Sequence, residues 1–287
     1  MGFVPTSIGR SLTRPTCALP LTFEQQRMPR LAANLGHLFT ERPPIERFGA
    51  AAAAGFTTVE LLFPYDVAAS AAKAELGRHG LTQLGVNTPP GRPGESGLAA
   101  LPGREREWEG AFERALDYAV RIGGRAVHCL AGCVAPEQRP VAEAIMIGNL
   151  SRAAERAAQA GIMLLIEPIN PRDRPGYFLN RVEHAADLIG KIGKANLRIQ
   201  FDFYHAQIVG GDLLRRFEAH LPLIGHVQIA GVPARREPDE GEVNYSEILT
   251  ALDQLGYAGF VGCEYRPRGR TEDGLDWAKP YGVLPRG

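Results

Sequence analysis

Residues 161–170 read GIMLLIEPIN, and this stretch decides how the fold is interpreted. The apolar run at 162–166 is short and continuous, as in a parallel strand that is covered on both faces. The run stops at Glu167, so an acid stands where the expected strand ends. Short apolar runs that end in polar residues recur along the chain on both sides of this stretch. We therefore interpret the run as one unit of a repeated parallel arrangement.

Eight such runs alternate with segments of helical periodicity. The expected strands cover residues 30–35, 57–62, 81–87, 126–130, 162–166, 197–201, 224–229 and 260–264. The expected helices cover residues 43–54, 68–79, 105–122, 141–160, 182–192, 212–220 and 245–255, with a short last one at 274–281. This alternation indicates βαβ units. The sequence predicts an α/β fold, a single (β/α)8 TIM barrel at residues 28–287. An open dinucleotide-binding sheet is disfavoured because GxGxxG is absent after the first strand.

Length and charge agree with one barrel that acts on small molecules. The chain has 287 residues, a usual size for this fold. Lys plus Arg and Asp plus Glu both number 32, so there is no basic excess to indicate a nucleic-acid partner. No apolar run approaches the roughly 20 residues that span a bilayer. The four cysteines include no CxxC pair, which disfavours a zinc site and favours a reducing compartment. We expect a cytoplasmic protein.

The first 27 residues differ from the rest. They contain Pro, Ser, Thr and Arg without periodicity, and Glu24 is their one acidic residue. They lack the apolar core of a secretory signal. We expect residues 1–27 to be a disordered extension, or to precede a true start at Met28; a transit peptide is the alternative.

Four of the expected strands end in oxygen-bearing side chains. Glu167, Asp202, Gln228 and Glu264 follow or end the runs near residues 166, 201, 229 and 263. In a TIM barrel these strand ends meet at the active-site face. Three carboxylates in one cavity repel one another unless a cation joins them. Oxygen ligands suit Mg²⁺ or Mn²⁺. The alternative is that each acid pairs with an arginine or caps a helix.

These segments resemble the hydroxypyruvate isomerase family of xylose-isomerase-like TIM barrels. The similar stretches are GIMLLIEPIN (161–170), IQFDFYHAQ (199–207), HVQIAGVPARREPDEGEVNY (226–245), GFVGCEYRP (259–267), NLGHLFTERP (34–43) and VELLFPYD (59–66). They occur in the family's order from about residue 28 to residue 267. The resemblance implies a metal-dependent isomerase that interconverts an aldose and a ketose form of a short hydroxy-keto acid.

The resemblance also implies roles for individual residues. Glu167, Asp202, Gln228 and Glu264 correspond to the ligands of the Mg²⁺ or Mn²⁺ ion, and Glu167 and Glu264 also to the proton donor and acceptor. The implied reaction converts hydroxypyruvate to tartronate semialdehyde through an enediolate. One departure concerns the substrate: residues 229–233 read IAGVP where many hydroxypyruvate isomerases have IADVP. Gly231 is more similar to the 2-oxo-tetronate isomerases, so conversion of 2-dehydrotetronate to 3-dehydrotetronate is the alternative.

The substrate carboxylate requires a cationic partner. Arg235 is the first candidate, because an arginine fork suits a carboxylate and the segment follows a strand at the active-site face. Arg236 is the alternative. His205 is a candidate to hydrogen-bond a substrate oxygen. Glu60 and His226 are polar residues of expected strands; each either forms a structural pair or has a role in the site. The sequence also leaves open whether the protein forms a homo-oligomer.

Three other functions compete with the isomerase. A sugar 3-epimerase would use the same pair of glutamates on the same barrel, although such enzymes have His where this chain has Gln228. An endonuclease-IV-like phosphodiesterase would require several His ligands and a basic groove for DNA, and neither is evident. A sugar-acid sensor would not require two proton-transfer groups. The paired glutamates therefore favour an enzyme.

Overall fold

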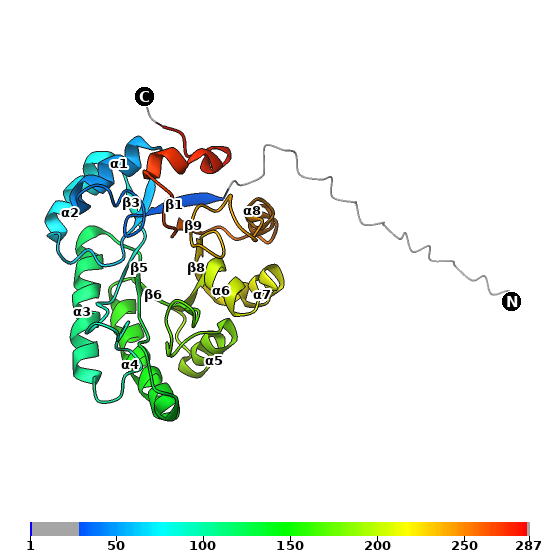
Figure 1. The fold of residues 1–287 in the computed structure, drawn as a ribbon. Coiled ribbons are helices and arrows are strands. Elements are labelled where there is room, and N and C mark those ends of the chain that lie inside the picture. Colours follow the sequence, from blue (N-terminus) through cyan, green and yellow to red (C-terminus); the bar gives the residue numbers. More distant parts are fainter. Residues whose placement is uncertain (2–28, 286–287) are drawn as a thin grey trace.

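The strands form one parallel sheet that curves into a barrel (Figure 1). The computed structural model describes residues 29–285, together with Met1. Its strands are β1 (Arg30–Asn34), β2 (Thr58–Glu60), β3 (Thr82–Gln83), β4 (Gly85–Asn87), β5 (Ala126–His128), β6 (Met163–Ile166), β7 (Leu197–Asp202), β8 (Ile224–Ile229) and β9 (Phe260–Cys263). Strand β1 pairs in parallel with both β2 and β9, which joins the two ends of the strand sequence. The predicted TIM barrel is confirmed.

The third expected strand is divided at Leu84. Strand β3 pairs with β2, whereas β4 pairs with β5. Leu84 bonds in both directions: its N–H donates to the carbonyl of Val59 at 2.9 Å, and its carbonyl accepts from the N–H of Arg125 at 2.7 Å. Two short segments thus occupy the place of one strand, and backbone hydrogen bonds continue from β2 to β5.

The helices surround the sheet (Figure 1). They are α1 (Arg47–Ala53), α2 (Ala69–His79), α3 (Glu105–Ile122), α4 (Arg139–Gln159), α5 (Val182–Ile192), α6 (Phe203–Val209), α7 (Leu213–His220) and α8 (Tyr245–Gln254). The short 3-10 turns are η2 (Pro44–Glu46), η3 (Pro136–Gln138), η4 (Leu221–Leu223), η5 (Thr271–Gly274) and η6 (Asp276–Tyr281). The sequence did not predict α6. The final expected helix is a 3-10 turn.

Helix α3 shows how these segments fold. Trp108, Phe112, Ala115, Ala119 and Ile122 are buried, and their spacing of three to four residues places them on one face. Burial of a large apolar side chain contributes about 1.5–3 kcal/mol. Gly123 ends the helix at φ 77°, in the left-handed region where glycine has no steric penalty.

The barrel interior is polar beneath its C-terminal mouth. Asn34, Glu60, Gln200, His226 and Gln228 are all buried there. TIM-barrel interiors are more often filled by layers of branched aliphatic residues. Because a buried polar group is costly without a partner, these side chains bond to one another. The resulting network includes Gln228 and lies below the other three residues that were predicted to bind a cation.

No helix of the described residues is long and apolar enough to cross a bilayer. The predictions for residues 1–27 lie, apart from Met1, outside the described part of the chain.

Candidate active site

The predicted ligands come from four consecutive strands of the barrel. Glu167 directly follows β6, Asp202 ends β7, Gln228 lies in β8 and Glu264 directly follows β9. All four side chains belong to buried residues, with exposures of 1–6%. Asp202 and Gln228 are register partners in the ladder between β7 and β8. The structure therefore places all four at the C-terminal end of the barrel, as the sequence indicated.

Glu167, Asp202 and His205 form a compact cluster. One potential ligand atom from each lies within 4.8 Å of the others. The His205 Nε2 atom is 3.5 Å from Asp202 Oδ2 and 3.8 Å from Glu167 Oε1. His205 reaches this position because α6 begins immediately after β7. The side chain of Asp202 caps that helix, with its Oδ1 accepting from the N–H of Tyr204 at 2.7 Å.

Asn170 determines how His205 bonds. Asn170 Oδ1 accepts from the N–H of Asp173 at 2.9 Å, which turns its Nδ2 group toward His205 Nδ1, 2.6 Å away. The backbone N–H of Asn170 also donates to Nδ1, at 3.4 Å. Burial, and then the charge of Arg235, lower the pKa of His205 well below its usual value. A neutral His205 with Nδ1 as acceptor has its proton on Nε2. This geometry favours His205 as a hydrogen-bond donor to the cluster over a metal ligand.

Three carboxylate oxygens in the site are buried without a hydrogen-bond partner. They are Glu167 Oε1, Asp202 Oδ2 and Glu264 Oε2. Buried acceptors without a hydrogen bond are costly, although Glu264 Oε2 forms an ion pair with Arg235 Nη2 at 3.1 Å. A hard divalent cation such as Mg²⁺ or Mn²⁺ accepts such oxygen donors. The residues therefore fit the cation that the sequence predicted.

The acids differ in their preferred protonation. Burial, and then the charges of Glu264 and Asp202, raise the pKa of Glu167 well above its usual value. Burial raises the pKa of Asp202 to about 7, although Arg235 opposes this shift. Burial would also raise the pKa of Glu264, but the charge of Arg235 and a hydrogen bond from His37 outweigh it and lower that pKa to about 2. Without a cation, Glu264 is the more strongly ionised of the two glutamates.

Arg235 lies among the acids. Its Nη2 atom is 3.1 Å from Glu264 Oε2 and 3.8 Å from Asp202 Oδ2. Its carbonyl accepts from the N–H of Arg266 at 2.7 Å, and its backbone has φ 54°, which turns the loop inward. The neighbouring Arg236 is exposed. The structure thus places the first candidate for the substrate carboxylate in the site and the alternative outside it.

Gln228 is bonded on both ends of its amide. Its Oε1 accepts from Gln200 Nε2 at 2.7 Å, and its Nε2 donates to Glu60 Oε1 at 3.0 Å. Glu60 Oε2 is 2.7 Å from His226 Nε2. Glu60 and His226 therefore pair with each other inside the barrel and do not face the mouth directly.

Glu167 and Glu264 line a cavity of about 320 Å³. Its walls include Glu167, His205, Arg235 and Glu264, together with side chains that the sequence did not single out: His37, Phe63, Arg174 and Arg266. His37 Nε2 is 3.4 Å from Glu264 Oε1. In the sequence, His37 could have been found as a polar residue just after the first expected strand. Arg266 likewise stands just after the last expected strand, two residues beyond Glu264.

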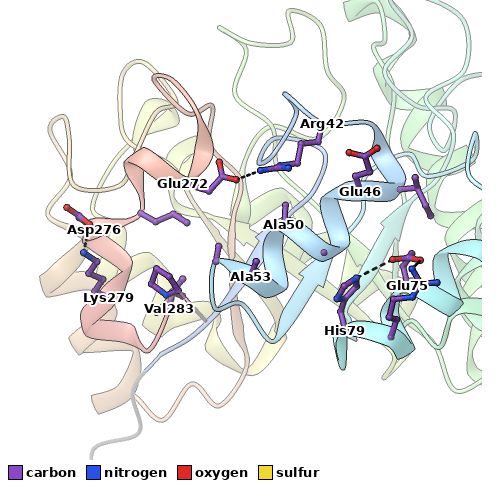
Figure 2. Close-up of a pocket in the computed structure, with 16 residues that line it drawn as sticks. Arg42, Glu46, Ala50, Ala53, Glu75, His79, Glu272, Asp276, Lys279 and Val283 are labelled. Carbon is purple, nitrogen blue, oxygen red and sulfur yellow. Dashed lines mark hydrogen bonds and ion pairs between the residues drawn. The ribbon is translucent and has the colours of Figure 1, made fainter. Parts of the chain in front are cut away.

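A larger cavity of about 720 Å³ lies outside the barrel, between α1, α2 and the C-terminal turns (Figure 2). The Arg42–Glu272 ion pair, at 2.8 Å, spans its rim. The walls contain none of the predicted site residues. Size alone therefore does not locate the chemistry in this chain.

Known proteins resemble the chain over nearly its whole length. A family model for the xylose isomerase-like TIM barrel matches residues 48–281. The 2-oxo-tetronate isomerase of Cupriavidus necator is 51% identical over 257 residues, which cover 88% of this chain and 99% of the relative. The hydroxypyruvate isomerase of Escherichia coli K12 is 40% identical over 257 residues, with 88% and 100% covered. A crystal structure described as an AP endonuclease, family 2, from Brucella melitensis has a TM-score of 0.87 at 47% identity and covers 89% and 100% of the two chains.

The sequence relatives and the fold agree with the resemblance inferred from the motifs. Both named sequence relatives are isomerases, and each is covered almost completely by this chain. The chain therefore belongs to the xylose isomerase-like TIM barrel family, as an isomerase of the group that contains the 2-oxo-tetronate and hydroxypyruvate isomerases.

Proposed function

We propose that the chain isomerises a short 2-keto-3-hydroxy acid, with Glu167 and Glu264 transferring the proton. The carbonyl moves from C2 to C3 through an enediolate: one proton leaves C3 and one is added to C2, while the hydroxyl proton leaves the C3 oxygen and one is added to the C2 oxygen. The observation that supports this most directly is that both glutamates line one cavity in environments that shift their pKa values in opposite directions. Such a pair provides a proton acceptor and a proton donor at the same substrate.

The oxygens of the site suit a divalent cation as the cofactor. Glu167, Asp202 and Glu264 each have a buried oxygen without a hydrogen bond, that of Glu264 being ion-paired with Arg235, and Gln228 is the proposed fourth ligand. When bound, the ion would stabilise the negative charge that develops on the substrate oxygens. The residues of the chain would orient the substrate and move the proton. His205, with a proton on Nε2, would donate a hydrogen bond to a substrate oxygen.

Arg235 is the proposed partner of the substrate carboxylate. Its Nε is buried and has no hydrogen-bond partner. Its side chain is 14% exposed, on the wall of the cavity that Glu167 and Glu264 line. A guanidinium in this position can bind the carboxylate through two parallel hydrogen bonds while the reacting carbons lie near the glutamates.

We favour the four-carbon acid, 2-oxo-tetronate, as the substrate over hydroxypyruvate. The relative at 51% identity is named 2-oxo-tetronate isomerase and the hydroxypyruvate isomerase of E. coli is 40% identical. Gly231 also supports this choice, because a Cβ at this position would lie 2.5 Å from the carbonyl oxygen of Glu237. An aspartate at 231 would therefore displace the loop that contains Arg235.

A DNA-directed activity has less support, although one structural relative is described as an AP endonuclease. The described part of the chain has a single metal-compatible cluster with one histidine. The whole chain has as many acidic as basic residues, 32 of each. A multi-metal phosphodiesterase with a basic groove would differ in both respects.

The test is direct conversion. The protein is treated with EDTA, given Mg²⁺ or Mn²⁺, and incubated in D2O with 2-oxo-tetronate or hydroxypyruvate, and the products are followed by NMR. We expect the carbonyl to move and deuterium to enter at C2 only when the cation is present. Inversion at one carbon without movement of the carbonyl would indicate an epimerase. No exchange with any acid or cation would refute the proposal.

A further inference from the structure

Glu60 occupies the barrel interior below the active site. It ends β2, it is 5% exposed, and three side chains from β1 and β8 bond to its carboxylate. Asn34 Nδ2 is 3.2 Å from Oε1, Gln228 Nε2 is 3.0 Å from the same oxygen, and His226 Nε2 is 2.7 Å from Oε2. Gly262 leaves the space for it, because a Cβ there would lie 2.1 Å from Glu60 Oε1.

The backbone fixes which end of the Asn34 amide faces Glu60. The N–H of Gly36 donates to Asn34 Oδ1 at 3.0 Å, so the other end of Asn34, its NH2 group, faces Glu60. Glu60 is therefore the acceptor in this pair. A carboxylate has no proton to donate, so it also attracts the NH2 end of the Gln228 amide. Glu60 thus determines the orientation of the amide of Gln228 by its chemistry.

The orientation of Gln228 has a consequence for the mouth of the barrel. With its NH2 group on Glu60, its carbonyl oxygen points toward β7, where Gln200 Nε2 lies at 2.7 Å. Strand β7 also provides Asp202, which pairs in register with Gln228. A flipped amide would instead present two N–H groups on this side, and these repel a cation.

We propose that Glu60 is a positioning residue, which holds the amide of Gln228 so that its oxygen and not its nitrogen faces the cation; this oxygen has a second lone pair besides the one that accepts from Gln200. The inference rests on the proposed function in one respect, namely that Gln228 is a ligand. It adds a residue outside the substrate cavity on which the affinity for the cation depends. Partners that orient metal ligands commonly contribute about 10- to 100-fold to metal affinity.

The test measures Mn²⁺ binding to the full chain without substrate, by electron paramagnetic resonance. Glu60→Met keeps a similar side-chain length but removes both acceptor oxygens, so we expect Mn²⁺ to bind about 10- to 100-fold more weakly. Glu60→Gln can keep an amide oxygen where Oε1 accepts from both Asn34 and Gln228, with its NH2 group toward His226. We therefore expect Glu60→Gln to bind Mn²⁺ within about tenfold of the parent.

Glu237→Gln is the matched control, because Glu237 is also a buried acid, 1% exposed, but bonds to Arg268 outside the barrel interior. It should bind Mn²⁺ like the parent. Thermal unfolding with EDTA shows which variants fold; if Glu60→Met does not fold, the comparison of Glu60→Gln with the parent decides.

Parental affinity in Glu60→Met, or a Glu60→Gln variant that folds but binds Mn²⁺ more than about tenfold more weakly than the parent, would overturn the inference alone. A parent that binds no Mn²⁺ would overturn it together with the proposed cofactor.

Discussion

Replacing Arg235 with methionine tests how the site holds an acidic substrate. Methionine retains most of the apolar length of arginine but removes the charge and the donors. The side chain of Arg235 is 14% exposed, and its Nη2 atom lies 3.1 Å from Glu264 Oε2 and 3.8 Å from Asp202 Oδ2. We expect Arg235→Met to raise the KM for keto acids strongly and to leave the barrel folded.

The magnitude follows from the burial of the charges. With an effective dielectric constant of about 20, unit charges 3.1 Å apart attract each other by about 5 kcal/mol before the costs of desolvation. Removing one side of a desolvated charge pair costs about 2–5 kcal/mol of binding. For the substrate carboxylate this corresponds to a loss of about 30- to 5,000-fold in affinity. The pKa of Glu264 should also rise from about 2, because its main positive partner is lost.

The assay compares KM and kcat for Arg235→Met and Arg236→Met with saturating Mn²⁺. Arg236 is exposed next to Arg235 in the chain, so its variant is a control for charge without a contact in the site. For a neutral analogue of the substrate, with an amide in place of the carboxylate, the KM values of the two variants should differ much less. A parental KM for Arg235→Met, or a larger effect of Arg236→Met, would refute the assignment.

Other predictions follow from the same site. Glu167→Gln and Glu264→Gln should each lower kcat by at least about 10²–10⁴-fold while the protein still folds, and the double variant should be little worse than the worse single one; near-parental turnover with normal metal content would show that the glutamate is only a ligand. Asp202→Asn should weaken the binding of Mn²⁺, with activity partly restored by excess cation; an affinity unchanged in titrations would contradict its role. Protons on Asp202, with its pKa of about 7, and on Glu167 compete with the cation, so Mn²⁺ affinity should increase as the pH rises from 6 to 8; a titration that shows the opposite slope would contradict this order. A chain that starts at Met28 should keep the melting temperature and turnover of the full chain, and a large loss in either would show that residues 1–27 are structural.

Local patterns in the sequence were sufficient to predict the barrel. Each strand is a short apolar run, and glycine ends several helices. Apolar periodicity and helix-ending glycines were therefore enough to locate most elements. Helix α5, Val182–Ile192, has the predicted bounds. The division at Leu84 was not visible, because β3 and β4 differ only in which neighbour they pair with. Helix α6 was missed because it begins directly at the end of a strand, capped by Asp202, without an intervening loop.

The candidate site was predictable only as far as the strand ends. The positions of Glu167, Asp202 and Glu264 follow from the fold, since parallel strands of a barrel end on one face. The choice between Arg235 and Arg236 did not follow, because it depends on a backbone turn with φ 54° that sequence periodicity does not show. The contact between His37 and Glu264 joins the first and last strands of the barrel. Such contacts depend on tertiary structure and were beyond a local pattern.

The acids of the candidate site differ in how readily they ionise. A metal ligand that also transfers protons faces a conflict, because ligation to a cation lowers the basicity of a carboxylate. In this chain Arg235 and a hydrogen bond from His37 lower the pKa of Glu264, whereas burial raises the pKa of Glu167 and of Asp202. The proposed cation would therefore displace protons mainly from Glu167 and Asp202. Glu264 would keep the same charge before and after metal binding. That asymmetry is a physical reason why two glutamates at one cation site can have different roles in a proton transfer.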